Sequence, residues 1–173
     1  MPPVHPLCPM KRKAEKKPFV STADGAKLKA MRLLMYRPRS EKELYDRLVE
    51  AGFEPEHTEE GIAYVKSFGY LDDEKYAASY VAAVKDSKSI SLIMRELAEK
   101  GVDETLTAKA VAEAEIDEEE TAYRLFVRRA GSPHPLDEAE ERRLYGYFAR
   151  RGFSAGVFFR TLKKYRNACG GDE

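Results

Sequence analysis

The sequence predicts an all-α protein made of three tandem three-helix repeats that form an elongated, curved body. Three observations support this prediction. From Ala26 onward, strong helix formers recur with apolar positions three and four residues apart, which is the spacing of one helix face. Charged residues make up 35% of the 173 residues, which suits long solvent-facing helices. A 14-residue segment also recurs at offsets of 49 residues (Gly52 to Gly101) and 51 residues (Gly101 to Gly152), a period typical of stacked helical units.

The repeated segment occupies residues 40–53, 89–102 and 140–153. Each copy has two apolar residues four positions apart, a glycine four positions later, and then another apolar residue. The matching sets are Leu44, Ile93 and Leu144; Leu48, Leu97 and Phe148; Gly52, Gly101 and Gly152; and Phe53, Val102 and Phe153. The apolar pair predicts one buried helix face, and the glycine predicts a left-handed residue that ends the helix. A further apolar residue ten positions past each glycine predicts a following helix.

This pattern divides the chain into five segments. We expect a flexible basic leader at 1–23, three-helix units at 24–71, 72–116 and 117–168, and a disordered tail at 169–173. Residues 11–17 carry five cations against one glutamate, so the leader is either a solvated basic arm or a segment that touches nucleic acid. Translation could also start at Met10.

Polar residues at the predicted joints match helix caps. Two pairs fit capping boxes, Ser40 with Glu43 and Asp117 with Glu120. Asp72 is a predicted N-cap, with Leu71 and Tyr76 spaced as a hydrophobic staple around it.

Nothing in the sequence argues for an enzyme. No glycine-rich phosphate loop, HExxH or CxxC occurs. Residues 152–156 match GxSxG, but a helix precedes them where a nucleophile elbow needs a strand, so Ser154 is predicted to be an N-cap. His5 and Cys8 lack further metal ligands, and the acidic run at 72–74 suits a helix start better than Mg²⁺. We therefore predict no catalytic residue, no metal, no cofactor and no small-molecule substrate.

Compartment signals favour the cytoplasm. No apolar stretch approaches the roughly 18 residues of a membrane span, and the first 17 residues lack a secretory apolar run. Cys8 and Cys169, in opposite tails, suit free thiols in a reducing compartment.

Charge is unevenly distributed although 30 basic and 30 acidic residues balance overall. Residues 96–120 hold ten acidic residues and two lysines, whereas residues 124–166 hold eleven basic and four acidic residues. Residues 142–166 contain eight Arg or Lys, seven aromatics and no acid. A face that mixes cations with aromatics can hold phosphates and stack bases, or dock on an acidic protein. The alternative is a solvated face whose aromatics turn inward.

Helical spacing separates the core positions of this basic segment from its candidate binding residues. Phe158, Leu162 and Tyr165 are predicted core, together with the repeated apolar positions. The candidate partner- or nucleic-acid-binding residues are Arg128, Arg129, Arg143, Tyr147, Arg150, Arg151, Phe159, Lys163, Lys164 and Arg166.

Four ordered segments support a family resemblance. GYLDDEKYA at 69–77 resembles the GYLDDExFA signature of the RecX family, the modulators of the RecA recombinase. RSEKEL at 39–44, followed by Leu48 and Gly52-Phe53, is similar to that family's RSxxEL…L…GF segment. REL at 95–97 with KGV at 100–102, and RRGF at 150–153, resemble two further family segments. The match runs from Lys27 to Arg166; the leader falls outside it, and Tyr76 replaces the usual Phe.

The resemblance implies a cytoplasmic, non-enzymatic regulator, mainly an inhibitor, built from tandem three-helix units. Such proteins bind in the groove of a RecA filament on single-stranded DNA. They suppress its ATPase, strand exchange and coprotease activity, and so act on DNA repair, DNA recombination and the SOS response. The implied partner is the RecA nucleoprotein filament; direct contact with single-stranded DNA is left open.

Two other functions also fit the sequence. One three-helix unit could act alone as a DNA-binding module of the helix-turn-helix type. The chain could also be a passive helical adaptor for another acidic partner.

Overall fold

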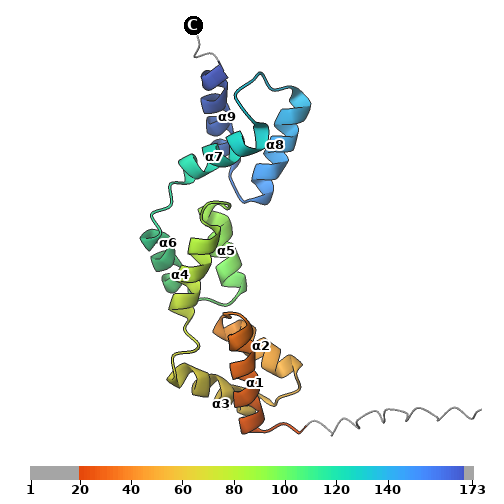
Figure 1. Cartoon of the computed structure of the whole chain (residues 1–173), viewed down its shortest axis with the longest axis vertical. Coiled ribbons are helices and arrows are strands. Elements are labelled where there is room, and N and C mark those ends of the chain that lie inside the picture. Colours follow the sequence, from red (N-terminus) through yellow and green to blue (C-terminus); the bar gives the residue numbers. More distant parts are fainter. Residues whose placement is uncertain (1–19, 170–173) are drawn as a thin grey trace, which may run out of the picture.

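In the computed structural model, which describes residues 20–169, the chain forms nine α-helices and no strand (Figure 1). Their bounds are α1 Ala23–Tyr36, α2 Glu41–Glu50, α3 Pro55–Ser67, α4 Asp73–Val84, α5 Ile90–Glu99, α6 Glu104–Glu113, α7 Glu118–Ala130, α8 Glu138–Arg150 and α9 Ala155–Cys169. The three units lie end to end, and the body is long and bowed. The predicted all-α repeat fold is confirmed.

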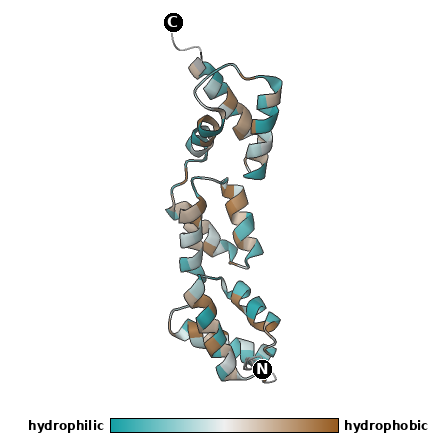
Figure 2. Cartoon of the chain, turned by 45° about the vertical axis from the view of Figure 1, so that its right-hand side comes forward, coloured by the Kyte–Doolittle hydropathy of each residue, from teal (hydrophilic) through white to brown (hydrophobic). Residues whose placement is uncertain are grey.

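Each unit has its own core. The helix pairs that pack most closely belong to the same unit, with α1 against α3, α4 against α6 and α7 against α9. Buried residues fall into three separate clusters, one per unit. Figure 2 likewise shows hydrophobic residues in all three units. A unit of about 50 residues buries little surface alone, so we expect the junctions between units to add stability to these separate cores. The exact domain boundaries given above stay a prediction.

The repeated sequence positions form the same structure three times. All nine apolar positions of the repeat are buried. Gly52, Gly101 and Gly152 have φ of 93°, 76° and 82°, the left-handed region that favours glycine. After each glycine, a backbone N–H donates to the carbonyl five residues back, at 3.0–3.2 Å. This is the hydrogen bond of a Schellman motif, so the predicted helix ends are confirmed.

The first and third cores are packed differently. In the third unit, the Phe126 ring centroid lies 5.7, 6.0 and 4.9 Å from those of Phe148, Phe158 and Tyr165. In the first unit, small residues bring two helices together instead. A Cβ added at Gly61 would lie 3.1 Å from the carbonyl carbon of Ala26. The α1–α3 contact is therefore close, whereas the third unit is filled by rings.

The helix caps agree with the sequence in part. Ser40, Asp72 and Asp117 are N-caps as predicted, and Ser154 accepts from the Val157 N–H at 3.2 Å. The predicted capping boxes were wrong in their second half. The Glu43 carboxylate bonds to Lys100, and that of Glu120 to Lys164, because these cations attract the carboxylates more strongly than a backbone N–H does. The full box forms instead at Asp137 and Glu140.

The predicted hydrophobic staple spans two cores. Leu71 is buried in the core of the first unit, whereas Tyr76 packs against the core of the second. Asp72 lies between them as the N-cap of α4, so these residues mark the passage from one unit to the next.

Ordered contacts begin before residue 24. Thr22 caps α1, and the Ser21 hydroxyl accepts from the Glu54 N–H at 3.0 Å. The rest of the predicted leader, with Met10, and residues 170–173 of the predicted tail lie outside the described residues; Cys169 ends α9. None of the helices within 20–169 is long and apolar enough to cross a membrane.

Candidate partner-binding surface

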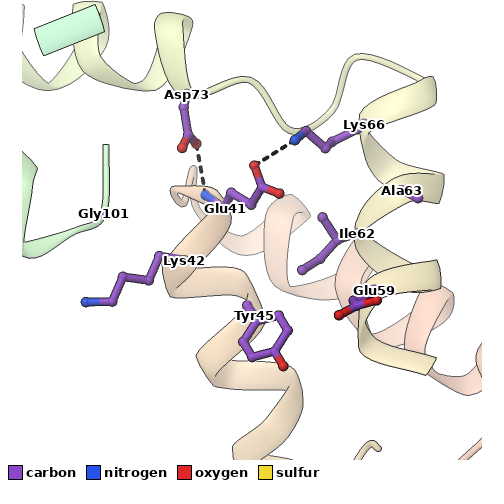
Figure 3. Close-up of a pocket in the computed structure, with 9 residues that line it drawn as sticks. All are labelled: Glu41, Lys42, Tyr45, Glu59, Ile62, Ala63, Lys66, Asp73 and Gly101. Carbon is purple, nitrogen blue, oxygen red and sulfur yellow. Dashed lines mark hydrogen bonds and ion pairs between the residues drawn. The ribbon is translucent and has the colours of Figure 1, made fainter. Parts of the chain in front are cut away.

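Two equivalent junctions join the units, the first between units one and two and the second between units two and three. At the first, the Ser40 hydroxyl donates to the Lys100 carbonyl at 2.6 Å. The Glu41 N–H donates to Asp73 at 2.9 Å, as Figure 3 shows. At the second, the Ser89 N–H donates to the Arg151 carbonyl at 2.9 Å. The Ile90 N–H donates to Glu118, also at 2.9 Å. Each central helix thus begins against the glycine turn of the next unit.

The glycine turns allow this close approach. A Cβ at Gly152 would lie 2.5 Å from both Leu92 Cβ and Ser89 Oγ. A Cβ at Gly101 would lie 2.6 Å from the Lys42 side chain. The same glycine therefore ends a helix and admits the neighbouring unit.

A cavity of about 560 Å³ lies beside the first junction (Figure 3). Its charged groups largely bond within the chain: Lys66 pairs with Glu41 at 2.7 Å, and Lys42 donates to the Glu99 carbonyl at 3.1 Å. Burial raises the pKa of the Asp73 carboxyl, although the Glu41 N–H partly offsets this. No predicted binding residue lines the cavity, whose lining is Glu41, Lys42, Tyr45, Glu59, Ile62, Ala63, Lys66, Asp73 and Gly101.

The structure separates the predicted cations into two groups. Two of them are already paired within the third unit, Lys164 with Glu120 at 3.2 Å and Arg166 with Glu141. Lys164 also lies 4.2 Å above the ring of Tyr123. These two side chains therefore form ion pairs within their own unit, and their part in partner binding stays a prediction.

The other group has no acidic partner among residues 20–169. It consists of Arg128, Arg129, Arg142, Arg143, Arg150, Arg151 and Lys163. All but the half-buried Arg151 are exposed. Arg142 was missed from the sequence, where its i, i+3 spacing to Tyr145 was a usable signal.

Two members of this second group lie against the ring of Tyr147. The guanidinium carbon of Arg151 lies 3.6 Å from the Tyr147 ring centroid, and that of Arg129 lies 5.6 Å away. Arg129 and Arg143 also line a small cavity of about 120 Å³ between α7 and α8. We call Arg129, Arg143, Tyr147 and Arg151 the Tyr147 cluster. Because the Arg151 carbonyl accepts from Ser89, the second junction fixes the backbone of this cluster.

Phe159 belongs to a different surface. Its side chain is 59% exposed, and its ring centroid lies 6.4 Å from that of Tyr145. Tyr145 and Tyr147 are two residues apart on α8, about 200° around the helix, so they point in opposite directions. The predicted set therefore occupies two surfaces of the third unit. Within the described chain, no group of three His, Cys, Asp or Glu could hold a metal ion.

Comparisons with known proteins assign the family. The sequence pattern of the first three-helix domain of RecX matches residues 26–64, and that of the third matches residues 117–162. A Regulatory protein RecX from Amycolatopsis mediterranei is 33% identical over 136 residues, covering 76% of this chain and 78% of the relative. The chain belongs to the RecX family. A second RecX relative, from Xanthomonas campestris, is 36% identical over 126 residues, with 72% and 78% covered.

The RecX fold is also shared with a solved structure. A crystal structure of RecX from Lactobacillus salivarius superposes with a TM-score of 0.66 at 20% identity, covering 83% of this chain and 96% of that one. The RecX relatives are named regulatory proteins, which supports a regulatory role for this chain.

Proposed function

We propose that this RecX-family protein is a non-enzymatic inhibitor of RecA that binds in the groove of the RecA–single-stranded DNA filament. It suppresses ATPase, strand exchange and coprotease activity in the cytoplasm, and so regulates DNA repair, DNA recombination and the SOS response. One observation carries the proposal: the third unit, at one end of an elongated body, has several cations without an acidic partner in the described residues, and two of them, Arg129 and Arg151, lie against Tyr147.

The cations suit a polyanion. Guanidinium groups bind phosphate and carboxylate oxygens in a fixed, two-pronged geometry. Tyr147 keeps two of these guanidinium groups close together. Because they are already ordered, less side-chain conformational entropy is lost when a partner binds. Arg143, Arg150 and Lys163 extend the same charge over α8 and α9.

The shape suits a polymer. Three units joined at repeated junctions can contact more than one protomer of a helical filament. A body held in the groove hinders the protomer rearrangements that hydrolysis and DNA exchange require. Ionic contacts between the cations of this chain and a negatively charged partner should weaken as the salt concentration rises.

The test is a RecA ATPase assay on single-stranded DNA with this protein titrated in. We expect hydrolysis to fall as the protein is added, and the inhibition to weaken as salt rises. Two results would contradict the proposal: no effect on RecA ATPase, as for an adaptor of another partner, or sequence-specific duplex binding without RecA, as for a helix-turn-helix module.

A further inference from the structure

Exposed apolar side chains are concentrated at the end of the molecule opposite the Tyr147 cluster. Ten large hydrophobic residues are exposed within residues 20–169, and eight of them lie in residues 20–70. The second unit has none, and the third has two. The eight are Val20, Leu28, Met35, Tyr36, Val49, Tyr64, Phe68 and Tyr70. Contiguous exposed apolar patches mark binding surfaces in soluble proteins, so those of the eight that adjoin one another are of interest.

Two of these side chains, Leu28 and Tyr64, line a groove between α1 and α3. The two helices run side by side in the same direction, since Ser21 bonds near the start of α3 and Lys27 reaches Glu60 at 3.8 Å. A cavity of about 350 Å³ lies between them, lined by Asp24, Lys27, Leu28, Met31 and Tyr64. The groove is therefore open and mainly apolar.

An aromatic row leads from Tyr64 of the groove past the end of α3. The Tyr64 and Phe68 ring centroids are 5.0 Å apart, and those of Phe68 and Tyr70 are 6.1 Å apart and nearly parallel. Phe68 and Tyr70 are each 59% exposed. Aromatic residues of this kind carry much of the binding energy at protein interfaces.

The close packing of α1 and α3 produces this groove. Ala26, Ala30 and Gly61 are buried where the helices meet, and a Cβ at Gly61 would press on Ala26. Because these contact residues are small, the longer side chains stand at the outer edges as two ridges. A groove between two helix ridges accepts the ridge of a third helix.

The charges beside the groove indicate what that helix carries. Asp24 and Glu60 both approach Lys27, at 3.4 and 3.8 Å, so two carboxylates share one ammonium. The Asp24 side chain is 92% exposed. These three groups together carry one net negative charge, which favours a Lys or Arg beside Asp24 and Glu60 over a phosphate.

We propose that the α1–α3 groove docks an amphipathic helix of a partner protein, with its apolar stripe on Leu28, Met31, Tyr64 and Phe68 and a basic residue beside Asp24 and Glu60. This helix-in-groove recognition is separate from the polyanion binding of the third unit and does not depend on it.

The experiment uses the full chain and three labelled peptides. The first is an amphipathic helix with Leu at i, i+3, i+4 and i+7 and flanking Lys; the second replaces Lys by Glu; the third is a scrambled form of the first. Fluorescence anisotropy should show the Lys-flanked helix binding at least tenfold more tightly than the other two. The exposed-site variant Leu28→Ser/Phe68→Ser should lose that preference.

The matched control is Phe159→Ser, which removes an equally exposed ring from the third unit and should leave peptide binding unchanged. Equal affinity for the scrambled peptide, or unchanged binding by the Leu28→Ser/Phe68→Ser variant, would overturn the proposal. So would a dimer in sedimentation velocity that this double variant abolishes, because the occupant would then be a second copy of the chain.

Discussion

The first and third units share the same arrangement of helices but differ in their exposed side chains. In both, a central helix ends at a left-handed glycine, and the next apolar residue closes the turn. The first unit exposes Leu28, Met35 and Phe68, whereas the third has the exposed Arg129 and the half-buried Arg151 against Tyr147. The repeated positions maintain the fold, so the positions between them are the ones free to acquire different binding surfaces.

The largest effect on stability should follow from a substitution in the core of one unit that leaves the other cores unchanged. Phe126→Ala removes a fully buried ring that contacts three others, and about 3–5 kcal/mol of stability should be lost. Hydrogen exchange should show the loss concentrated in 117–168. Leu48→Ala is the counterpart in the first unit, and its loss of hydrogen-exchange protection should be concentrated in residues 24–71. An equal loss of protection in all three units would contradict the separate cores.

The next effect tests the second junction. Gly152→Ala should cost about 2–4 kcal/mol, since the new Cβ meets Leu92 Cβ and the backbone keeps a positive φ. Gly69→Ala has a positive φ but open space around it, so only strain of about 1–2 kcal/mol is expected. Urea unfolding measures both. Equal costs would mean that the close approach at Gly152 is unimportant.

A smaller effect should separate the two tyrosines of α8. Tyr147→Leu removes the ring that Arg129 and Arg151 share, so we expect filament affinity to fall about five- to tenfold, corresponding to about 1–1.4 kcal/mol. Tyr145→Leu, on the opposite face of α8, should change it little. Binding to fluorescent filaments measures the difference. A larger loss for Tyr145→Leu would contradict the proposal, because the binding surface would then lie on the Tyr145 face of α8.

The smallest effect concerns pH at the first junction. Burial opposes ionisation of Glu43, but the hydrogen bond from Lys100 and the nearby charges outweigh it, so the pKa of this carboxyl is lowered. The resulting stability is fully present above the ordinary value of 4.5 and disappears as pH falls through the lowered folded-state pKa.

Glu43→Gln should therefore cost about 1 kcal/mol at pH 7 and almost nothing in strong acid. Thermal unfolding between pH 7 and pH 3 checks this. Identical pH profiles for the variant and the original chain would show that the Glu43–Lys100 pair does not stabilise the fold.

The sequence predicted the fold well because the repeat combines two independent signals, apolar spacing and a helix-ending glycine. It predicted the contacts of the candidate binding residues less well. Helical spacing could not show that Glu120 and Glu141 would pair with Lys164 and Arg166, because these contacts join different helices. For the same reason, the Arg129–Tyr147–Arg151 contact and the α1–α3 groove became visible only once the helices were packed.

The most direct measurement is the affinity for RecA filaments of two charge-reversal triples. Arg143→Glu/Arg150→Glu/Lys163→Glu changes the third unit, and Lys75→Glu/Arg95→Glu/Lys109→Glu makes the same charge change on exposed cations of the second unit. With helicity unchanged, the first triple should bind at least about 100-fold more weakly and with a shallower salt dependence, and the second should lose far less. Equal losses, or undiminished binding by the first triple, would contradict the assignment of this surface.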